Sequence, residues 1–203
     1  MRARALTLAG AAAGLGVALW WRKNPSACPY NQRFWIQAPH PLITRSRLRQ
    51  ALEPRAGERV LEVGPGTGYY ALEVAEWIAP DGRLEIFDLQ QEMLDHTLRH
   101  AAERGLENVA ATQGDATRLP YEDASFDAAY LVTVLGEIPD QAAALRELRR
   151  VLKSGGRLVV GEVALDPHVV FPGPLRERAE AAGLRFDRQV GGKLGFFARF
   201  LSP

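Results

Sequence analysis

The sequence predicts an α/β fold with a doubly wound, mostly parallel sheet of seven strands. Short apolar runs bounded by turn residues alternate with longer segments whose apolar residues recur at helical spacing. A glycine-rich turn joins the first strand to the helix after it, and acidic residues follow the next two strands. This order is Rossmann-like, and such sheets bind ligands at the carboxyl ends of their strands.

The predicted elements follow one another in β/α order. Strands are expected near residues 60–63, 83–88, 109–112, 126–132, 157–163, 184–190 and 194–201. Helices are expected over residues 43–52, 68–79, 90–104, 140–152 and 174–182. Basic residues oppose the negative carboxyl end of the 140–152 helix, and Gly155-Gly156 stops it. The last two strands meet at Gly191-Gly192 and predict a closing antiparallel hairpin.

The turn after the first strand carries three glycines at alternate positions, Gly64, Gly66 and Gly68. Glycines let the backbone turn tightly and approach a ligand where a Cβ would collide. The following helix presents free amides and the positive end of its dipole to that ligand. A dinucleotide fingerprint would need glycine in place of Tyr69, and no Lys-Ser or Lys-Thr follows to hold a triphosphate. The turn therefore predicts the floor of a different nucleotide-type cofactor site.

Acidic residues stand where two of the following strands end. Asp88 lies twenty residues beyond Gly68, the distance at which a carboxylate can accept both hydroxyls of a ribose. Asp115 follows the next strand. Both have a plainer alternative, because Asp is a favoured cap of helices and turns. Glu62, in the first strand, has the alternative role of a strand-end charge satisfied by backbone amides.

Five signatures in order resemble the class I S-adenosylmethionine-dependent methyltransferases, especially the small quinone, sterol and lipid methyltransferases with a type 11 methyltransferase domain. They are E-V-G-P-G-T-G at 62–68, the strand-terminal Asp88, G-D-A at 114–116, Ser125–Tyr130 and Leu148–Leu158. The likeness covers roughly residues 55–165. It implies methyl transfer as the activity and S-adenosylmethionine as the cofactor.

The resemblance also implies which residues bind the cofactor. The glycines of the turn, with Pro65 between them, approach the methionine part, and Glu62 helps to orient its ammonium group. Asp88 takes the ribose, and Asp115 receives the adenine amino group. The implied cofactor-binding set is Glu62, Gly64, Pro65, Gly66, Gly68, Asp88, Leu89, Asp115, Ala116, Thr133 and Val134.

Four members of that set have implied roles away from the glycine turn. Leu89 and Ala116 flank the adenine ring, and Thr133 and Val134 border the transferred methyl. A sulfonium methyl is already activated, so the protein mainly aligns the acceptor and keeps water out. No protein nucleophile is needed.

A general base matters only if the acceptor must lose a proton. The candidates near the cleft are Glu137, after the fourth strand, and Asp166 or His168, after the fifth. Tyr30 lies in a segment rich in proline and aromatic residues, which could cover the cleft or lie on a membrane. Glu137, His168 and Tyr30 are the catalytic candidates, and the acid and histidine candidates have the alternative role of surface or capping residues.

Composition limits the possible classes of function. The 203 residues, 47% hydrophobic and 24% charged, suffice for one domain with a full core. A net charge of +1 argues against nucleic-acid binding, which needs a clustered basic excess. The single cysteine, Cys28, excludes an intrachain disulfide and favours a reducing compartment. No Cys or His cluster has metal-ligand spacing, so no metal is expected.

An uncharged apolar run covers residues 5–21. As a helix its 17 residues span about 25 Å, slightly short of the ~30 Å hydrocarbon layer. Two tryptophans and two cations follow one another at its end, as at a membrane interface. We therefore expect residues 1–23 to form a membrane-anchor helix, and the spacing of Gly10 and Gly14 allows a homodimer.

The alternatives for this segment are a cleaved signal peptide, a lipoprotein signal near Cys28 and a buried core helix. The two signals would carry the domain away from a cofactor made inside cells, so the catalytic domain is expected to face the cytoplasm. Residues 24–57 are expected to form a linker with a lid helix, and residues 58–203 the methyltransferase domain.

The expected function is membrane-associated methyl transfer, by in-line displacement, to a lipid-soluble or membrane-presented acceptor. One alternative is a methyltransferase for a small soluble thiol, amine or hydroxyl compound. The other is a cofactor-binding scaffold without catalysis.

Overall fold

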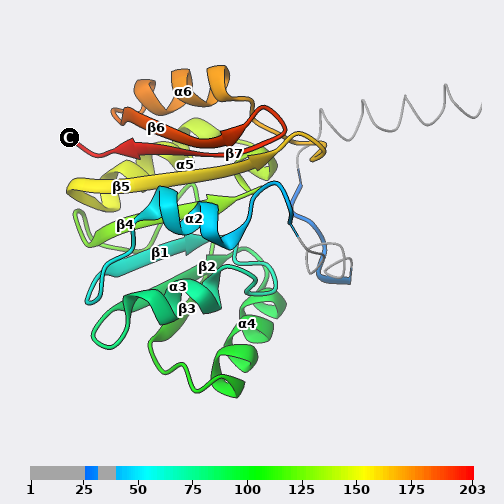
Figure 1. Ribbon diagram of the computed structural model, residues 1–203, viewed down its shortest axis with the longest axis vertical. Coiled ribbons are helices and arrows are strands. Elements are labelled where there is room, and N and C mark those ends of the chain that lie inside the picture. The colour runs from blue at the N-terminus through cyan, green and yellow to red at the C-terminus, as the bar shows by residue number, and fades with distance from the viewer. Residues whose placement is uncertain (1–25, 32–39) are drawn as a thin grey trace, which may run out of the picture.

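The structure, a computed structural model, describes residues 26–31 and 40–203 (Figure 1). The strands are β1 (Arg59–Val63), β2 (Arg83–Asp88), β3 (Val109–Gln113), β4 (Phe126–Val132), β5 (Leu152–Val163), β6 (Arg185–Gly192) and β7 (Gly195–Leu201). The helices are α2 (Arg45–Leu52), α3 (Ala71–Ile78), α4 (Gln91–Glu103), α5 (Gln141–Val151), α6 (Pro172–Ala181) and the short 3₁₀ helix η2 (Leu135–Glu137). These positions confirm the predicted order of strands and helices.

The described strands form one seven-stranded sheet in the order β3-β2-β1-β4-β5-β7-β6. Strands β1 to β5 are parallel, whereas β7 runs antiparallel to both β5 and β6. The predicted closing hairpin is therefore confirmed. The chain moves outward from β1 to β3 and then returns to place β4 beside β1, so the strand order reverses between β1 and β4. Open α/β sheets bind ligands outside such a reversal point.

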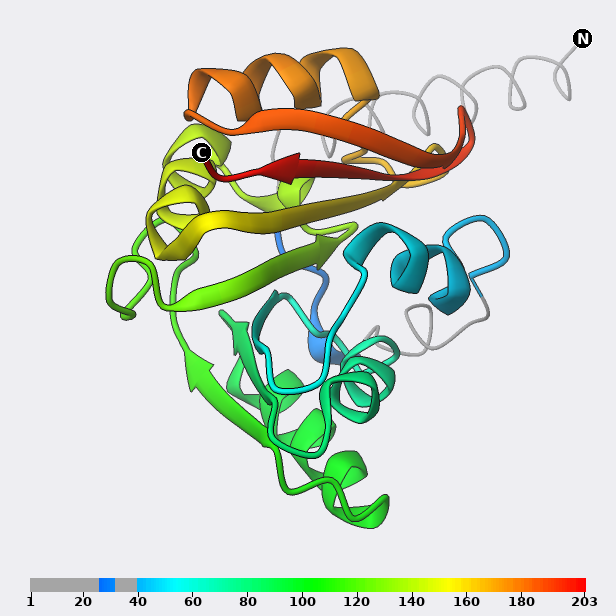
Figure 2. The ribbon, with the colours of Figure 1, turned by 60° about the vertical axis from the view of Figure 1, so that its left-hand side comes forward.

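Helices cover both faces of the sheet (Figure 2). Successive strand residues point to opposite faces, so Val60 packs with α2 and α3 while Leu61 packs with α5 and α6. Leu84 and Phe87 on β2 divide in the same way between the two cores. The apolar strands are therefore buried on both sides, as parallel sheets require.

Helix α5 ends earlier than the glycine signal predicts. It ends at Val151, and Leu152 already has extended backbone and pairs with Phe126 of β4. The Leu152 side chain is fully buried, and this burial favours the strand over another helical residue. Gly155, with a φ of 75°, lies inside the irregular start of β5, so Gly155-Gly156 does not stop the helix.

No helix among residues 26–31 and 40–203 is long and apolar enough to cross a membrane. The apolar run at 5–21, with Gly10 and Gly14, lies outside the described residues. The membrane-anchor helix therefore stays a prediction.

A buried ion pair joins α2 to the sheet. Arg157 Nη2 donates to both carboxylate oxygens of Glu58, at 2.8 and 2.6 Å, and Arg157 Nε donates to the Leu52 carbonyl at 2.8 Å. Both charged residues are at most 9% exposed. The pair fixes the carboxyl end of α2 beside β5. Residues 40–43, which precede α2 in the chain, line the cavity at the carboxyl ends of the parallel strands.

We expect Glu58→Ala to lower the free energy of unfolding by about 3–5 kcal/mol, because it leaves a guanidinium buried without its counter-ion. Urea unfolding measures this change. Glu180→Ala is the matched control, since the Arg176–Glu180 pair is exposed and its loss should cost about 1 kcal/mol or less. Equal losses in the two variants would mean that the buried guanidinium finds water instead.

Candidate active site

A cavity of about 1060 Å³ opens at the carboxyl ends of β1, β2, β4 and β5. Its size is at the upper end of the range for small-molecule sites, roughly 300–1,000 Å³. Most of the predicted site residues line it: Gly64, Pro65, Gly66, Asp88, Leu89, Asp115, Ala116, Thr133, Val134, Glu137 and His168. Glu62, Gly68 and Tyr30 do not line it. No Lys or Arg of the described residues lies in its wall.

The glycine turn fits closely between β4 and α4. Gly64 and Gly66 have φ values of 71° and 54°, in the left-handed region that favours glycine. A Cβ on Gly64 would lie 2.4 Å from Val134 Cγ2, so glycine is needed for the β1 and β4 loops to meet. A Cβ on Gly68 would instead lie 3.0 Å from Thr97 Cγ2. Gly68 therefore packs the turn against α4 and lies behind the cavity wall.

Glu62 lies buried at the base of this turn, with 2% of its surface exposed. Its Oε2 has no hydrogen-bond partner among the described residues. Burial, together with the negative charge of Asp88, raises the pKa of Glu62 to about 8. A buried carboxyl oxygen without a partner fits the implied role of holding an ammonium group, because a bound cation would satisfy it.

Asp88 ends β2 inside the cavity and is 9% exposed. Its Oδ1 accepts a hydrogen bond from the Gln90 backbone N–H at 2.9 Å, which fixes the carboxyl group at the end of the strand. Burial raises the pKa of Asp88 to about 6. The N-cap of α4 is Gln90 and not Asp88, so the Asp88 carboxyl group orders the turn before that helix and faces the cavity where a ribose is expected.

The cavity wall continues beyond Asp88 with Leu89, Asp115 and Ala116. Leu89 is 59% exposed although it lines the cavity, and the wall continues through Ala116. Asp115 Oδ1 accepts hydrogen bonds from the Thr117 backbone N–H and hydroxyl, both at 2.8 Å, which lower the pKa of Asp115. The turn-capping interpretation of Asp115 therefore holds for this oxygen, while the side chain remains in the cavity wall.

The end of β4 is strained. Thr133 has a φ of 55°, and a β-branched side chain rarely adopts this left-handed backbone. The Thr133 backbone N–H donates to the Gly161 carbonyl at 2.8 Å, which ties the strained residue to β5. The resulting bend directs Val134 against Gly64. Thr133 and Val134 therefore lie at the strand reversal beside the glycine turn, where the resemblance places the transferred methyl.

Carboxyl groups gather at the other end of the cavity. Burial, together with the nearby charge of Asp166, raises the pKa of Glu137, on η2, to about 8. Asp166 Oδ1 accepts a hydrogen bond from the His168 backbone N–H at 2.7 Å. Glu162, 1% exposed on β5, has its pKa raised to about 9 by burial. The sequence analysis missed Glu162, although an acid within the apolar run 158–163 was an available signal.

Residues 26–31 lie as a strap against the cavity. The Gln90 side chain binds the strap twice: its Nε2 donates to the Cys28 carbonyl at 2.9 Å, and its Oε1 accepts from the Tyr30 backbone N–H at 3.1 Å. The Cys28 backbone amide lies near the Glu137 carboxyl group and lowers its pKa, against the larger effect of burial. The Tyr30 hydroxyl lies 3.4 Å from His96 Nδ1 on α4, outside the cavity. This placement argues against Tyr30 as a catalytic residue.

We expect Gln90→Ala to release the strap and to increase the rate at which a thiol reagent alkylates Cys28 by about 10- to 30-fold. Two hydrogen bonds, each worth about 1 kcal/mol, are lost. Gln91→Ala is the matched control, because its side chain binds only the exposed Asp95 among the described contacts. An unchanged rate in Gln90→Ala would show that other contacts hold the strap.

Comparison with known proteins agrees with this geometry. Residues 60–156 match a family model described as a methyltransferase domain. The demethylmenaquinone methyltransferase of Staphylococcus aureus is 32% identical over 152 residues, which cover 75% of this chain and 60% of that protein. A 37.1 kDa protein in transposon TN4556 of Streptomyces fradiae is 41% identical over 125 residues, which cover 60% of this chain and 35% of that protein. This chain therefore spans about three fifths of the length of the demethylmenaquinone methyltransferase and about a third of the length of the TN4556 protein.

Solved structures show the same fold. A methyltransferase from Aquifex aeolicus, described as dependent on S-adenosylmethionine, superimposes with a TM-score of 0.80 at 22% identity, over 87% of this chain and all of that one. The [4+2]-cyclase SpnF superimposes with a TM-score of 0.66 at 32% identity, over 74% of this chain and 60% of that one. The family match, the relatives and the solved structures agree: residues 60–156 carry a methyltransferase domain, and the fold around them is that of solved methyltransferase structures.

Proposed function

We propose that the protein transfers the methyl group of S-adenosylmethionine to a lipid-soluble or membrane-presented acceptor. The observation that carries the methyl-transfer part is the cavity at the strand reversal, which the glycine turn and Asp88 line, with the orphaned oxygen of Glu62 buried at the base of that turn. Glu62 would hold the ammonium group, Asp88 the ribose hydroxyls, and Leu89 with Ala116 the adenine. When bound, S-adenosylmethionine supplies an activated sulfonium methyl.

The chain's own residues align and enclose the acceptor. Thr133 and Val134 form the cavity wall beside Gly64, and Glu137 follows them in the same wall. Glu137 can take a proton from a hydroxyl, thiol or ammonium group, because a carboxylate with a pKa near 8 is a competent base at neutral pH. Since the described wall holds carboxyl groups and no Lys or Arg, it favours an acceptor without negative charge.

The lipid part of the proposal rests on other observations. The apolar run at 5–21 has the length and flanks of a membrane anchor, and one relative is named for a quinone-type substrate, demethylmenaquinone. Residues 26–28 and 40–43 line the cavity, which supports the assignment of 24–57 as linker and lid. We place the catalytic domain at the cytoplasmic side, where the cofactor is made, and keep a homodimer through Gly10 and Gly14 as part of the proposal.

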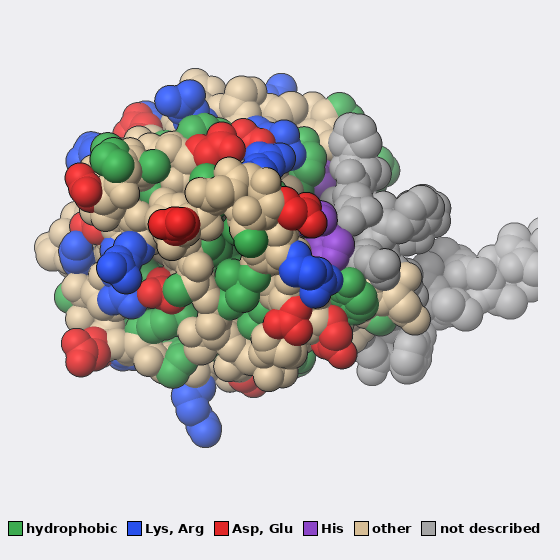
Figure 3. Space-filling view, turned by 90° about the horizontal axis from the view of Figure 1, so that it is seen from below, with side chains coloured by type: hydrophobic (Ala, Val, Ile, Leu, Met, Phe, Trp, Pro, Cys, Tyr) green, Lys and Arg blue, Asp and Glu red, His purple; other side chains and the backbone are tan. Residues whose placement is uncertain are grey.

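The face of the molecule shown in Figure 3 gives no reason to propose nucleic acid as a partner. On the face shown in Figure 3, acidic and basic side chains of the described residues are interspersed and form no continuous basic band. Nucleic-acid binding needs such a band to neutralise phosphates.

The proposal is tested with full-length protein in vesicles of native lipid extract and methyl-labelled S-adenosylmethionine. Label should appear in the organic phase and be absent with Asp88→Ala. Label that depends on Asp88 but stays in the aqueous phase would favour a small soluble acceptor. No label in either phase would contradict methyl transfer and favour the scaffold alternative, or chemistry of the kind for which the similar cyclase is named.

A further inference from the structure

The large apolar side chains that the described residues expose all lie in loops at the carboxyl ends of the parallel strands. They are Leu89, Leu165, Phe171 and Leu194, exposed by 59%, 86%, 43% and 63%. Leu89 follows β2, whereas Leu165 and Phe171 lie between β5 and α6. Leu194 lies in the turn before β7, and that turn is at the same end of the sheet because Gly195 pairs with Val163 at the end of β5. The cavity opens at this end.

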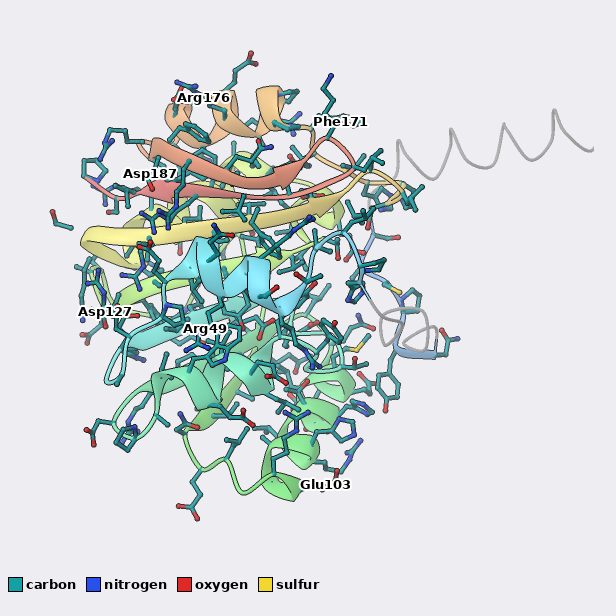
Figure 4. The ribbon with its side chains drawn as sticks, in the orientation of Figure 1. Arg49, Glu103, Asp127, Phe171, Arg176 and Asp187 are labelled. Atoms are coloured by element: carbon teal, nitrogen blue, oxygen red, sulfur yellow. The ribbon has the colours of Figure 1, made fainter. Side chains whose placement is uncertain are left out.

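Leu89 has an implied role beside the adenine ring of the cofactor, but the other three exposed side chains need another explanation. We call Leu165, Phe171 and Leu194 the apolar rim. The Ala164 backbone N–H donates to the Leu194 carbonyl at 2.9 Å, so the loops that carry Leu165 and Leu194 lie side by side. Figure 4 shows Phe171 at the start of α6, at the opposite end of the sheet from Asp127. Apolar side chains gathered beside a cavity mouth are typical of an interaction surface.

The sequence indicates what lies next to the rim. Ser26 lines the same cavity as Leu165, and the apolar run at 5–21 ends five residues before Ser26. Five residues extend at most about 17 Å, whatever their conformation. Whatever receives the apolar run must therefore lie close to the cavity mouth. Lys193, exposed beside Leu194, adds a cation of the kind that favours lipid headgroups.

We propose that the apolar rim docks on a lipid bilayer, with the cavity mouth facing the membrane surface. This inference rests on the proposed function, in which residues 5–21 hold the protein at that membrane. The rim is a second contact, made by the catalytic domain, and it fixes the orientation of the domain. An acceptor dissolved in the bilayer then enters the cavity beside Leu165 and reaches Glu137 without crossing water.

Site-specific fluorescence tests the docking in the full-length chain. In a Cys28→Ser background, Leu194→Cys carries an environment-sensitive fluorophore, and Asp81→Cys is the control. Asp81 is exposed in the loop before β2, at the far edge of the sheet. With vesicles of phosphatidylcholine and phosphatidylglycerol, emission from position 194 should shift to the blue and be quenched several-fold more by spin-labelled lipid than emission from position 81.

Each other outcome overturns the docking in a distinct way. If the protein floats with the vesicles but the two positions respond alike, the anchor stands and the rim does not touch lipid. A blue shift without vesicles, together with a doubled mass by light scattering, would assign the rim to a second copy of the chain. A protein that does not float with the vesicles would contradict both proposed membrane contacts, the apolar run and the apolar rim. Methyl transfer measured on the same samples tests the proposed enzymatic activity separately.

Discussion

Replacement of Asp88 by alanine is expected to weaken S-adenosylmethionine binding by about 100-fold. Asp88 lines the cavity at the end of β2, and an ionised carboxylate that accepts two ribose hydroxyls contributes about 1.5–3 kcal/mol for each hydrogen bond. Loss of one such contribution in full and part of the other corresponds to about 2.8 kcal/mol, or two factors of ten. Isothermal titration calorimetry with the full-length protein measures the change.

The pH dependence of binding has a defined direction. Burial raises the pKa of Asp88 to about 6, and the ionised form is the one that accepts both hydroxyls. Affinity should therefore be full above pH 6 and fall as the pH drops through that value. Asp95→Ala is the matched control, because Asp95 is an exposed residue of the same type on α4 and its loss should leave both affinity and pH dependence unchanged.

A stability measurement separates the cofactor role of Asp88 from a capping role. A buried carboxyl whose pKa is raised in the folded state disfavours folding at neutral pH, because the charged form is less stable inside the protein than in water. Asp88→Asn removes the charge and can still accept the hydrogen bond from the Gln90 N–H. It should bind the cofactor more weakly without a lower free energy of unfolding. Unchanged affinity with reduced stability would leave Asp88 as a cap alone.

Local signals in the sequence were sufficient to predict that the glycine turn and Asp88 lie at the cavity. The glycine turn needs left-handed backbone at Gly64 and Gly66, and that need is visible in the sequence because glycine alone meets it cheaply. Asp88 was predictable because strand length fixes where the chain leaves the sheet. The closing hairpin was predictable for a similar reason, since Gly191-Gly192 separates two runs with strand character.

Contacts between distant segments were not predictable in the same way. Gln90 and Cys28 are 62 positions apart, so no local pattern indicates that their groups pair. Thr133 adopts a backbone that its own residue type disfavours, and the hydrogen bond to Gly161 that helps to hold it appears only once β4 and β5 are side by side. The same dependence on tertiary packing explains the end of α5, where burial of Leu152 outweighs the downstream glycines.

Glu137→Gln is expected to lower kcat by about 100-fold or more if the acceptor must lose a proton in the reaction. General-base catalysis typically contributes 10²–10⁴-fold, and glutamine keeps the size of the side chain without its basicity. In the wild-type enzyme, the rate should rise with pH through about 8 and level off about one pH unit higher, because the base acts only when ionised. The variant should lose this rise. Initial rates across pH, with cofactor saturating, measure both effects.

Asp166→Asn makes the assignment of the base sharper. The charge of Asp166 helps to raise the pKa of Glu137, so its removal should move the rise in rate to lower pH while kcat on the plateau is kept. A catalytic Asp166 would instead lose the plateau itself. Because the Cys28 backbone amide also lies near the Glu137 carboxyl group, Cys28 alkylation must be measured in Glu137→Gln as well. A lost pH rise with unchanged alkylation identifies Glu137 as the base, whereas faster alkylation with the pH rise intact reduces Glu137 to a holder of the strap.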